Sequence, residues 1–316
     1  MTTAIPDSFT ECYVAFVDIL GVRALVKRSQ SEADLYQNIV SALVEAKNLS
    51  VFRRDRRDID TGNVASWALQ VQAFSDCVVL FIPVESGMLS WLLASVRRLH
   101  DRMIGLGVCL RGAVTIGGMH WDSQWSAQSS VEAHAEDAIG SESTPVAFGP
   151  GLVAAYELED GCAVYPRFLI AGDLYDHIES LGLGRDGAFP LARDGRLLDF
   201  IRQDFDGLWH FDVLHRDINR RDVLSQVKET NEQGNAVVRN EFDETSYEDR
   251  LIELRRFITR NIETCAKEPI LAKYQWLARY FNEKSRPVGV KAIPIFKDEL
   301  PEGVPQLKIT WPRDPT

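Results

Sequence analysis

Short apolar runs alternate with amphipathic segments in the first half of the chain, and this order constrains the fold more than any other feature. The strand-like runs cover residues 12–18, 67–74, 77–82 and 107–116, and the helix-like segments cover residues 31–47 and 88–104. Only Ser75 and Asp76 separate the second and third strands, which predicts a hairpin. The order β-α-β-β-α-β predicts a ferredoxin-like sheet of the α/β (α+β) class. In such a sheet strand 3 lies between strands 1 and 2 and is antiparallel to both.

The second half of the chain is less regular. It predicts a polar loop or hairpin at 121–144, a helix at 147–159, a strand at 167–171, loops at 182–196, a polar stretch at 219–245 and helices at 251–265 and 270–281. The charged tract at 53–60 is predicted to be a solvated loop or helix end. We therefore expect a catalytic domain over residues 1–200 and a mainly helical extension over residues 201–316.

The charge balance excludes several classes of partner. The 316 residues include 35 basic and 46 acidic side chains, for a net charge of −11. Nucleic acid and anionic membranes favour a basic protein surface, so neither is an expected partner. No signal peptide or membrane-spanning run is visible. The five scattered cysteines form no CxxC pair and predict reduced thiols in a cytoplasmic protein.

Two aspartates stand where the predicted sheet brings strand ends together. Asp18 ends strand 1 and Asp76 lies where strand 3 begins, and these strands are antiparallel neighbours. Two carboxylates so placed repel each other unless a cation such as Mg²⁺ or Mn²⁺ lies between them. Gly21 precedes a helical segment whose free N–H groups could hold a triphosphate, and Arg23 adds a positive charge. The alternative is structural, with Asp18 capping the helix and Asp76 favouring the turn.

Four motifs resemble those of class III nucleotidyl cyclase domains, in the same order. They are FVDILG (Phe16 to Gly21), FSD (Phe74 to Asp76), LRGAVTIGG (Leu110 to Gly118) and FGPGLVAAYELE (Phe148 to Glu159). The resemblance covers roughly residues 11–172 and is greatest to the pyrimidine cyclases of the Pycsar antiphage systems. The segment KYQWLARYFN (Lys273 to Asn282) resembles the tail of that group. Gly117 and Gly118 are interpreted as the turn of a dimer-forming hairpin.

The resemblance implies a homodimer with active sites at the subunit interface and two divalent ions, Mn²⁺ or Mg²⁺, in each site. Asp18, Asp76 and the carbonyl of Ile19 would ligate these ions. The residues expected to bind the nucleotide are Ile19, Leu20, Gly21, Val22 and Arg23. The implied reaction is attack of the ribose 3′-hydroxyl on the α-phosphorus with release of pyrophosphate.

One departure from the family concerns the transition state. The adenylyl and guanylyl enzymes carry an Asn and an Arg four residues apart on the helix after the hairpin, where this chain has Val153 and Glu157. An anionic Glu cannot neutralise charge on a phosphoryl group. Arg111 and Arg167 are the candidate replacements. Each has an ordinary salt bridge as its alternative role, since a buried cation needs a partner.

The expected function is that of a uridylate cyclase, which converts UTP to 3′,5′-cyclic UMP as a second messenger in antiphage defence. The alternatives that stay open are a cytidylate cyclase making cyclic CMP and an adenylyl or guanylyl cyclase. A different two-metal enzyme is less consistent with the sequence, because no GG(D/E)EF turn and no Asp-x-Asp motif at Asp18 is present. A catalytically inactive cyclase fold that serves as a sensor is a further alternative. It is supported by Val153 and Glu157, which replace the Asn and Arg of the active enzymes.

Overall fold

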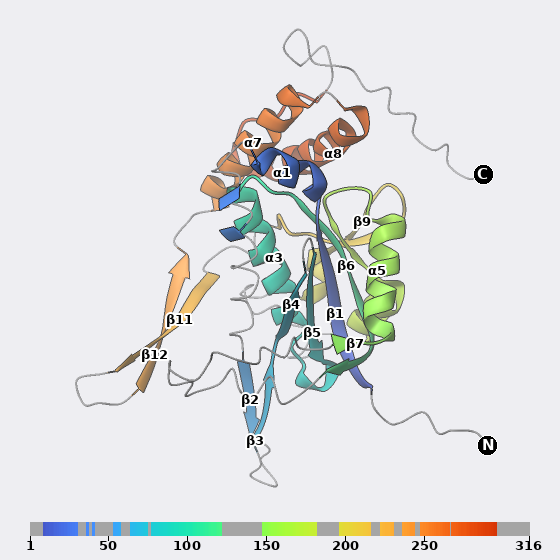
Figure 1. Ribbon diagram of the computed structural model, residues 1–316, viewed down its shortest axis with the longest axis vertical. Helices are drawn as coiled ribbons and strands as arrows, with labels where there is room; N and C mark the ends of the chain where they lie inside the picture. The colour runs from blue at the N-terminus through green and yellow to red at the C-terminus, as the bar shows by residue number, and fades with distance from the viewer. Residues whose placement is uncertain are drawn as a thin grey trace, which may run out of the picture.

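The computed structural model describes most of the chain (Figure 1). The described residues are 9–30, 36–37, 40–41, 53–57, 64–74, 77–121, 147–181, 196–215, 222–230, 236–243, 247–265 and 267–295. They form a mixed α/β structure built on one large sheet, with helices on both faces of that sheet.

Eight strands of the described chain form the large sheet. Its order is β4-β5-β1-β6-β8-β10-β9, with β7 paired to β6. The β6–β8 pair is parallel and every other pair is antiparallel. The strands of the sheet are β1 (Thr10–Ile19), β4 (Gln70–Ala73), β5 (Cys77–Pro83), β6 (Leu110–Trp121), β7 (Ala147–Phe148), β8 (Phe168–Ile170), β9 (Ile201–Gln203) and β10 (Trp209–Phe211).

The arrangement predicted for the strands of the first half of the chain is confirmed, although the predicted strand at 67–74 is divided between β3 and β4. β5 lies between β1 and β4 and is antiparallel to both, and β6 pairs with the other edge of β1. Strand 3 of the predicted unit therefore lies next to strand 1, which brings the end of β1 beside the start of β5.

Helices cover the two faces of the sheet and one of its ends. They are α1 (Val22–Ser29), α3 (Leu89–Gly105), α5 (Pro150–Cys162), α6 (Gly172–Ser180), α7 (Tyr247–Thr264) and α8 (Glu268–Ser285), with short 3₁₀ turns η2 (Val84–Ser86), η4 (Leu197–Phe200) and η6 (Arg286–Val288). α3 covers one face of the sheet and α5 the other (Figure 1). α7 packs on α3 and α8, and α7, α8 and α1 gather at the end of the sheet where β1 finishes.

Several segments differ from their predictions. The charged tract was expected to be a loop or helix end, but Arg53–Arg57 forms β2 and pairs with β3 (Val64–Ala68). Strand pairing satisfies backbone groups, so a run of charged side chains does not prevent it. The predicted helix at 31–47 falls largely outside the described residues, and the four residues of it that are described, 36–37 and 40–41, are helical. Most of the predicted loop at 121–144 also lies outside the described residues.

The chain after residue 200 contains more strand than was expected. β9 and β10 extend the large sheet, and β11 (Asp222–Thr230) and β12 (Ala236–Asp243) form a separate hairpin beside the main body (Figure 1). The strands β11 and β12 were not predicted because this segment is polar and lacks the apolar alternation that indicates a strand. The two expected C-terminal helices are present as α7 and α8. Among the described residues, no helix is both long enough and apolar enough to span a membrane.

Candidate functional site

Strand alternation directs Asp18 toward α5. The odd-numbered apolar residues of β1 join the larger core with α3, whereas Cys12 and Val14 join a smaller core beneath α5. Asp18 continues this second set, because strand side chains alternate with a period of two. Its Cα pairs with Cys77 of β5 on one side and with Arg111 of β6 on the other. These three residues thus form a row across three adjacent strands, on the α5 face.

Glycines allow α5 to lie directly against β6. A Cβ at Gly117 would lie 2.8 Å from the Cα of Gly151, and a Cβ at Gly149 would lie 2.2 Å from the carbonyl oxygen of Gly118. The hydroxyl of Thr115 donates to the Gly151 carbonyl at 3.0 Å. The interpretation of Gly117 and Gly118 as a turn is therefore wrong, since both lie within β6. They are needed because the start of α5 crosses the strand there.

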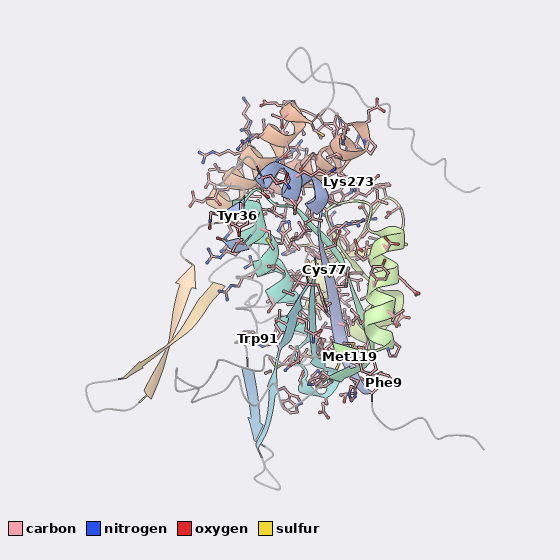
Figure 2. All side chains as sticks on the ribbon, in the orientation of Figure 1. Phe9, Tyr36, Cys77, Trp91, Met119 and Lys273 are labelled. Carbon is pink, nitrogen blue, oxygen red and sulfur yellow. The ribbon has the colours of Figure 1, made fainter. Side chains whose placement is uncertain are left out.

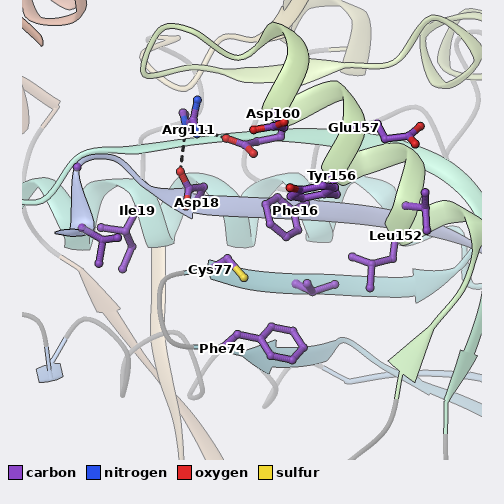
Figure 3. A pocket seen from close by; sticks show the side chains of 15 residues that line it. Phe16, Asp18, Ile19, Phe74, Cys77, Arg111, Leu152, Tyr156, Glu157 and Asp160 are labelled. Carbon is purple, nitrogen blue, oxygen red and sulfur yellow. Dashed lines mark hydrogen bonds and ion pairs between the residues drawn. The ribbon is translucent and has the colours of Figure 1, made fainter.

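An open cleft of about 910 Å³ lies between α5 and the ends of β1 and β5. Four carboxylates face it from the strand and the helix (Figure 3). The lining residues are Phe16, Asp18, Ile19, Gly21, Val22, Phe74, Cys77, Val79, Arg111, Leu152, Val153, Tyr156, Glu157, Glu159 and Asp160.

Arg111 joins the two sides of this cleft. Its Nε donates to Oδ2 of Asp18 at 3.0 Å (Figure 3). Its Nη1 donates to the carbonyl oxygen of Ala163 at 3.1 Å. The same Nε lies 2.7 Å from Oε1 of Glu159, as an ion pair. A guanidinium held by two carboxylates and a carbonyl is fixed in position, so Arg111 ties the end of α5 to the end of β1.

Glu159 is the most deeply buried ionisable group among the described residues of the cleft. Its side chain is 3% exposed, and the single hydrogen on the Arg111 Nε points to Asp18. Its Oε1 accepts no hydrogen bond from any described residue. Burial above all, together with the charges of Asp18 and Asp160, raises the pKa of Glu159 to about 7 against the opposing effects of Arg111 and Lys273.

The loop that was predicted to bind nucleotide borders the cleft. Ile19, Gly21 and Val22 line it, and the N–H of Leu20 donates to the Cys109 carbonyl at 2.9 Å. Gly21 has φ +77°, a left-handed conformation that favours glycine, and α1 begins at the next residue. The backbone of Arg23 belongs to α1, and its side chain lies outside the described part of the structure.

Asp76, the second predicted metal ligand, lies outside the described residues. It directly precedes Cys77, whose Cα pairs with that of Asp18. The expected meeting of the two aspartates therefore stays a prediction, while the strand register on which it depends is present.

Arg167 does not line the cleft. Its side chain is 1% exposed and forms ion pairs with Asp204 and Asp206, next to the rings of Tyr165 and Trp276. Its neighbours come from the segment before β8, from the turn between β9 and β10, and from α8. Of the two arginines considered for catalysis, the structure brings only Arg111 to Asp18. Arg167 has the salt-bridge role that was its alternative.

Sequence reasoning singled out Val153 and Glu157 on the helix that borders the cleft, but it missed Tyr156 and Asp160. Val153, Tyr156, Glu157 and Asp160 form one stripe of α5, with the i, i+3 and i+4 spacing of a helix face. Tyr156 packs edge-on against Phe16, with ring centroids 5.5 Å apart. The helical spacing could have indicated this stripe. Val153 and Glu157, which the resemblance aligns with the Asn and Arg of adenylyl and guanylyl cyclases, both border the cleft.

No protein-family model matches the chain, and no curated protein matches it. Within the part of the chain that the structure describes, no group of three or more His, Cys, Asp or Glu side chains is arranged to hold a metal ion. Asp76 is not in that part.

Proposed function

We propose that the chain is a metal-dependent pyrimidine nucleotide cyclase of the class III type. It would convert UTP to 3′,5′-cyclic UMP and pyrophosphate, as a cytoplasmic second-messenger enzyme of antiphage defence. The observation that carries the proposal is the position of Asp18. It lies one residue before the end of β1, lines an open cleft, and is paired with the residue that directly follows Asp76.

The residues at this position fit a hard divalent ion in ligand type. Carboxylate oxygens are the ligands that Mg²⁺ and Mn²⁺ prefer. Arg111 takes up one oxygen of Asp18, but a carboxylate has about four acceptor positions and can accept a guanidinium and ligate a cation together. Asp18, Asp76 and the carbonyl of Ile19 would hold the ions. Bound ions would acidify the ribose 3′-hydroxyl and neutralise the phosphates.

The reaction makes one bond and breaks one. The ribose 3′-hydroxyl would give its proton to water, its oxygen would attack the α-phosphorus, and the bond from this phosphorus to the bridging oxygen would break as pyrophosphate leaves. The N–H groups at the start of α1, after Gly21, would bind the phosphates. Arg111 would keep Asp18 aligned through its hydrogen bond.

We expect a second copy of the chain to pack over the cleft. Three large apolar side chains at the cleft are about half exposed, namely Val153 (54%), Tyr156 (50%) and Phe74 (47%). Exposed apolar groups gathered at one place are typical of an interaction surface. A homodimer with active sites at the subunit interface would bury them over the nucleotide. Light scattering at micromolar concentration tests this arrangement, which a strictly monomeric active enzyme would contradict.

Substitution of the two aspartates tests the site. Asp18→Ala and Asp76→Ala should each abolish formation of cyclic UMP from UTP and Mn²⁺, because each removes a charge that the ions require. Asp176→Ala, which removes an exposed carboxylate of α6, is the matched control and should keep full activity. Circular dichroism checks that all three variants fold. Substantial cyclic UMP from either cleft variant would overturn the ligand assignment for that residue.

One observation favours a second function, nucleotide binding without catalysis. Glu157 lines the cleft where the family carries an arginine, and Arg111 is already engaged by Asp18. A sensor of this kind would bind Mn²⁺–UTP and form no product. Calorimetry combined with product analysis separates the two functions.

A further inference from the structure

Arg111 contacts its two carboxylate partners in different ways. Its Nε donates a hydrogen bond to Oδ2 of Asp18 at 3.0 Å. Oε1 of Glu159 lies 2.7 Å from the same nitrogen but receives no hydrogen bond from any described residue. In Figure 2 this end of the sheet is marked by Cys77, which pairs with Asp18 and lies below helices α1 and α8. Glu159 therefore acts on Arg111 through its charge and not through a hydrogen bond.

Arg167 shows the ordinary form of a buried arginine between two carboxylates. Its Nη1 donates to Asp204 and Asp206, and its Nη2 donates to the second oxygen of Asp206. Hydrogen bonds of this kind are what a buried charge normally requires. Glu159 is buried more deeply than either aspartate, with 3% of its side chain exposed against 16% and 27%, and its Oε1 has no such bond. Holding an arginine in place does not by itself account for Glu159.

The charges of the three cleft side chains determine how Asp18 meets a cation. Arg111 is positively charged, and on its own it would neutralise Asp18. Glu159 adds a second negative charge beside the same nitrogen, so that the three side chains together stay anionic. A divalent cation is attracted to an anionic site and gains little from a neutral ion pair. Glu159 thus restores the attraction that the contact with Arg111 would cancel.

The other acidic residues of the cleft are placed differently. Glu157 and Asp160 line the cleft from the same helix, but both side chains are exposed. Neither forms an ion pair with a described residue, and solvent and salt screen exposed charges. Glu159 is the buried member of the set, in direct contact with the arginine that binds Asp18.

We propose that Glu159 is a positioning residue of the metal site, which offsets the charge of Arg111 so that Asp18 keeps its negative charge for a divalent cation. The inference rests on the proposed function for the identity of the cation, Mn²⁺ or Mg²⁺. Glu159 does not ligate the ion itself. It acts through Arg111, whose Nε lies between the two carboxylates.

The test compares variants of the full-length chain. Glu159→Gln keeps the shape of the side chain and removes its charge. Combining it with Arg111→Met also removes the positive charge, so that Asp18 is again uncompensated. Glu157→Gln removes an exposed cleft carboxylate of the same helix and is the matched control. Electron paramagnetic resonance of free Mn²⁺ measures the affinity for Mn²⁺ at pH 8 without nucleotide. Urea unfolding identifies any variant that fails to fold, and Arg111→Gln then replaces Arg111→Met.

The expected result is a loss of about tenfold in Mn²⁺ affinity for Glu159→Gln, the order of effect of one partly screened charge close to a divalent ion. The double variant should recover most of this loss, because Asp18 then faces no competing cation. Glu157→Gln should change the affinity by less than about twofold. Unchanged affinity in Glu159→Gln, or an equal loss in Glu157→Gln, would overturn the inference. A double variant that recovers nothing would also overturn it, because Glu159 would then act on the ion without Arg111.

The Mn²⁺ measurement separates this inference from the proposed function. If the affinity depends on Glu159 but the wild-type chain cyclises no nucleotide, the cyclase proposal fails and the role of Glu159 at a cation site stands. If cyclic UMP forms but the affinity does not depend on Glu159, the inference fails and the proposed function stands. A wild-type chain that binds no Mn²⁺ would overturn the inference.

Discussion

Replacing Glu159 with Gln should stabilise the metal-free protein at alkaline pH and leave it unchanged at acidic pH. The substitution keeps the shape of the side chain and removes its ionisation. Burial raises the pKa of Glu159 from the ordinary value of 4.5 to about 7 in the folded chain. The folded state thus binds more protons than the unfolded state between these two values. Stability therefore falls as pH rises through this window, and the full penalty is present above pH 7.

The size of the penalty follows from the shift. At about 1.4 kcal/mol for each tenfold change in proton affinity, the shift corresponds to about 3 kcal/mol. Burial is the largest cause of the shift, and water in the open cleft reduces the cost of burying the charge, so we expect roughly half of this, about 1–2 kcal/mol. This figure already includes the attraction of Arg111, which opposes the shift.

Urea unfolding in EDTA at pH 5 and pH 8 measures the effect. Glu159→Gln should raise the free energy of unfolding at pH 8 by about 1–2 kcal/mol relative to wild type and change it little at pH 5. Glu157→Gln, on the exposed face of the same helix, is the control and should change neither value. An equal loss of stability at both pH values would refute the reasoning, because it would show that the Arg111–Glu159 pair is a net stabiliser.

Three further predictions concern packing, reactivity and Arg167. Gly117→Ala should lower the free energy of unfolding by about 1–3 kcal/mol in urea titrations, because its Cβ would lie 2.8 Å from the Cα of Gly151. Cys77 lines the cleft and should react with N-ethylmaleimide faster than the buried Cys12, because burial raises the pKa of Cys12 to about 12. Mn²⁺–UTP should slow the reaction at Cys77, and peptide mass mapping measures the reaction rate at both cysteines. Arg167→Ala should lower the free energy of unfolding by about 3–5 kcal/mol, because it leaves two carboxylates unpaired. Any activity per folded molecule, measured at reduced temperature, should stay near that of the wild type. A stable but inactive variant would restore Arg167 as a catalytic candidate.

The sheet could be predicted from the sequence because its strands carry strong local signals. Apolar runs bounded by turns identified β1 and β5, and the hairpin between β4 and β5 followed from the two residues that separate them. The short strands β9 and β10 were missed, since three residues are too few to show a period. β2 was missed because its charged side chains do not resemble those of a buried strand.

The candidate site was predictable where position along a strand decided it. Asp18 follows from the end of an apolar run, and Gly21 from the start of a helix. Arg167 could be identified as a buried cation from its apolar surroundings, but its partners Asp204 and Asp206 lie in a distant turn that no local pattern indicates.

Product analysis with each of the four ribonucleoside triphosphates and Mn²⁺ tests the proposed function most directly. Chromatography and mass spectrometry of the products should show 3′,5′-cyclic UMP and pyrophosphate from UTP, with the Asp18→Ala variant as the blank. Cyclic CMP from CTP would keep the pyrimidine class and change the base. Exclusive cyclic AMP would contradict the pyrimidine assignment, and the absence of any cyclic product from a folded protein with bound Mn²⁺ would contradict cyclase activity itself.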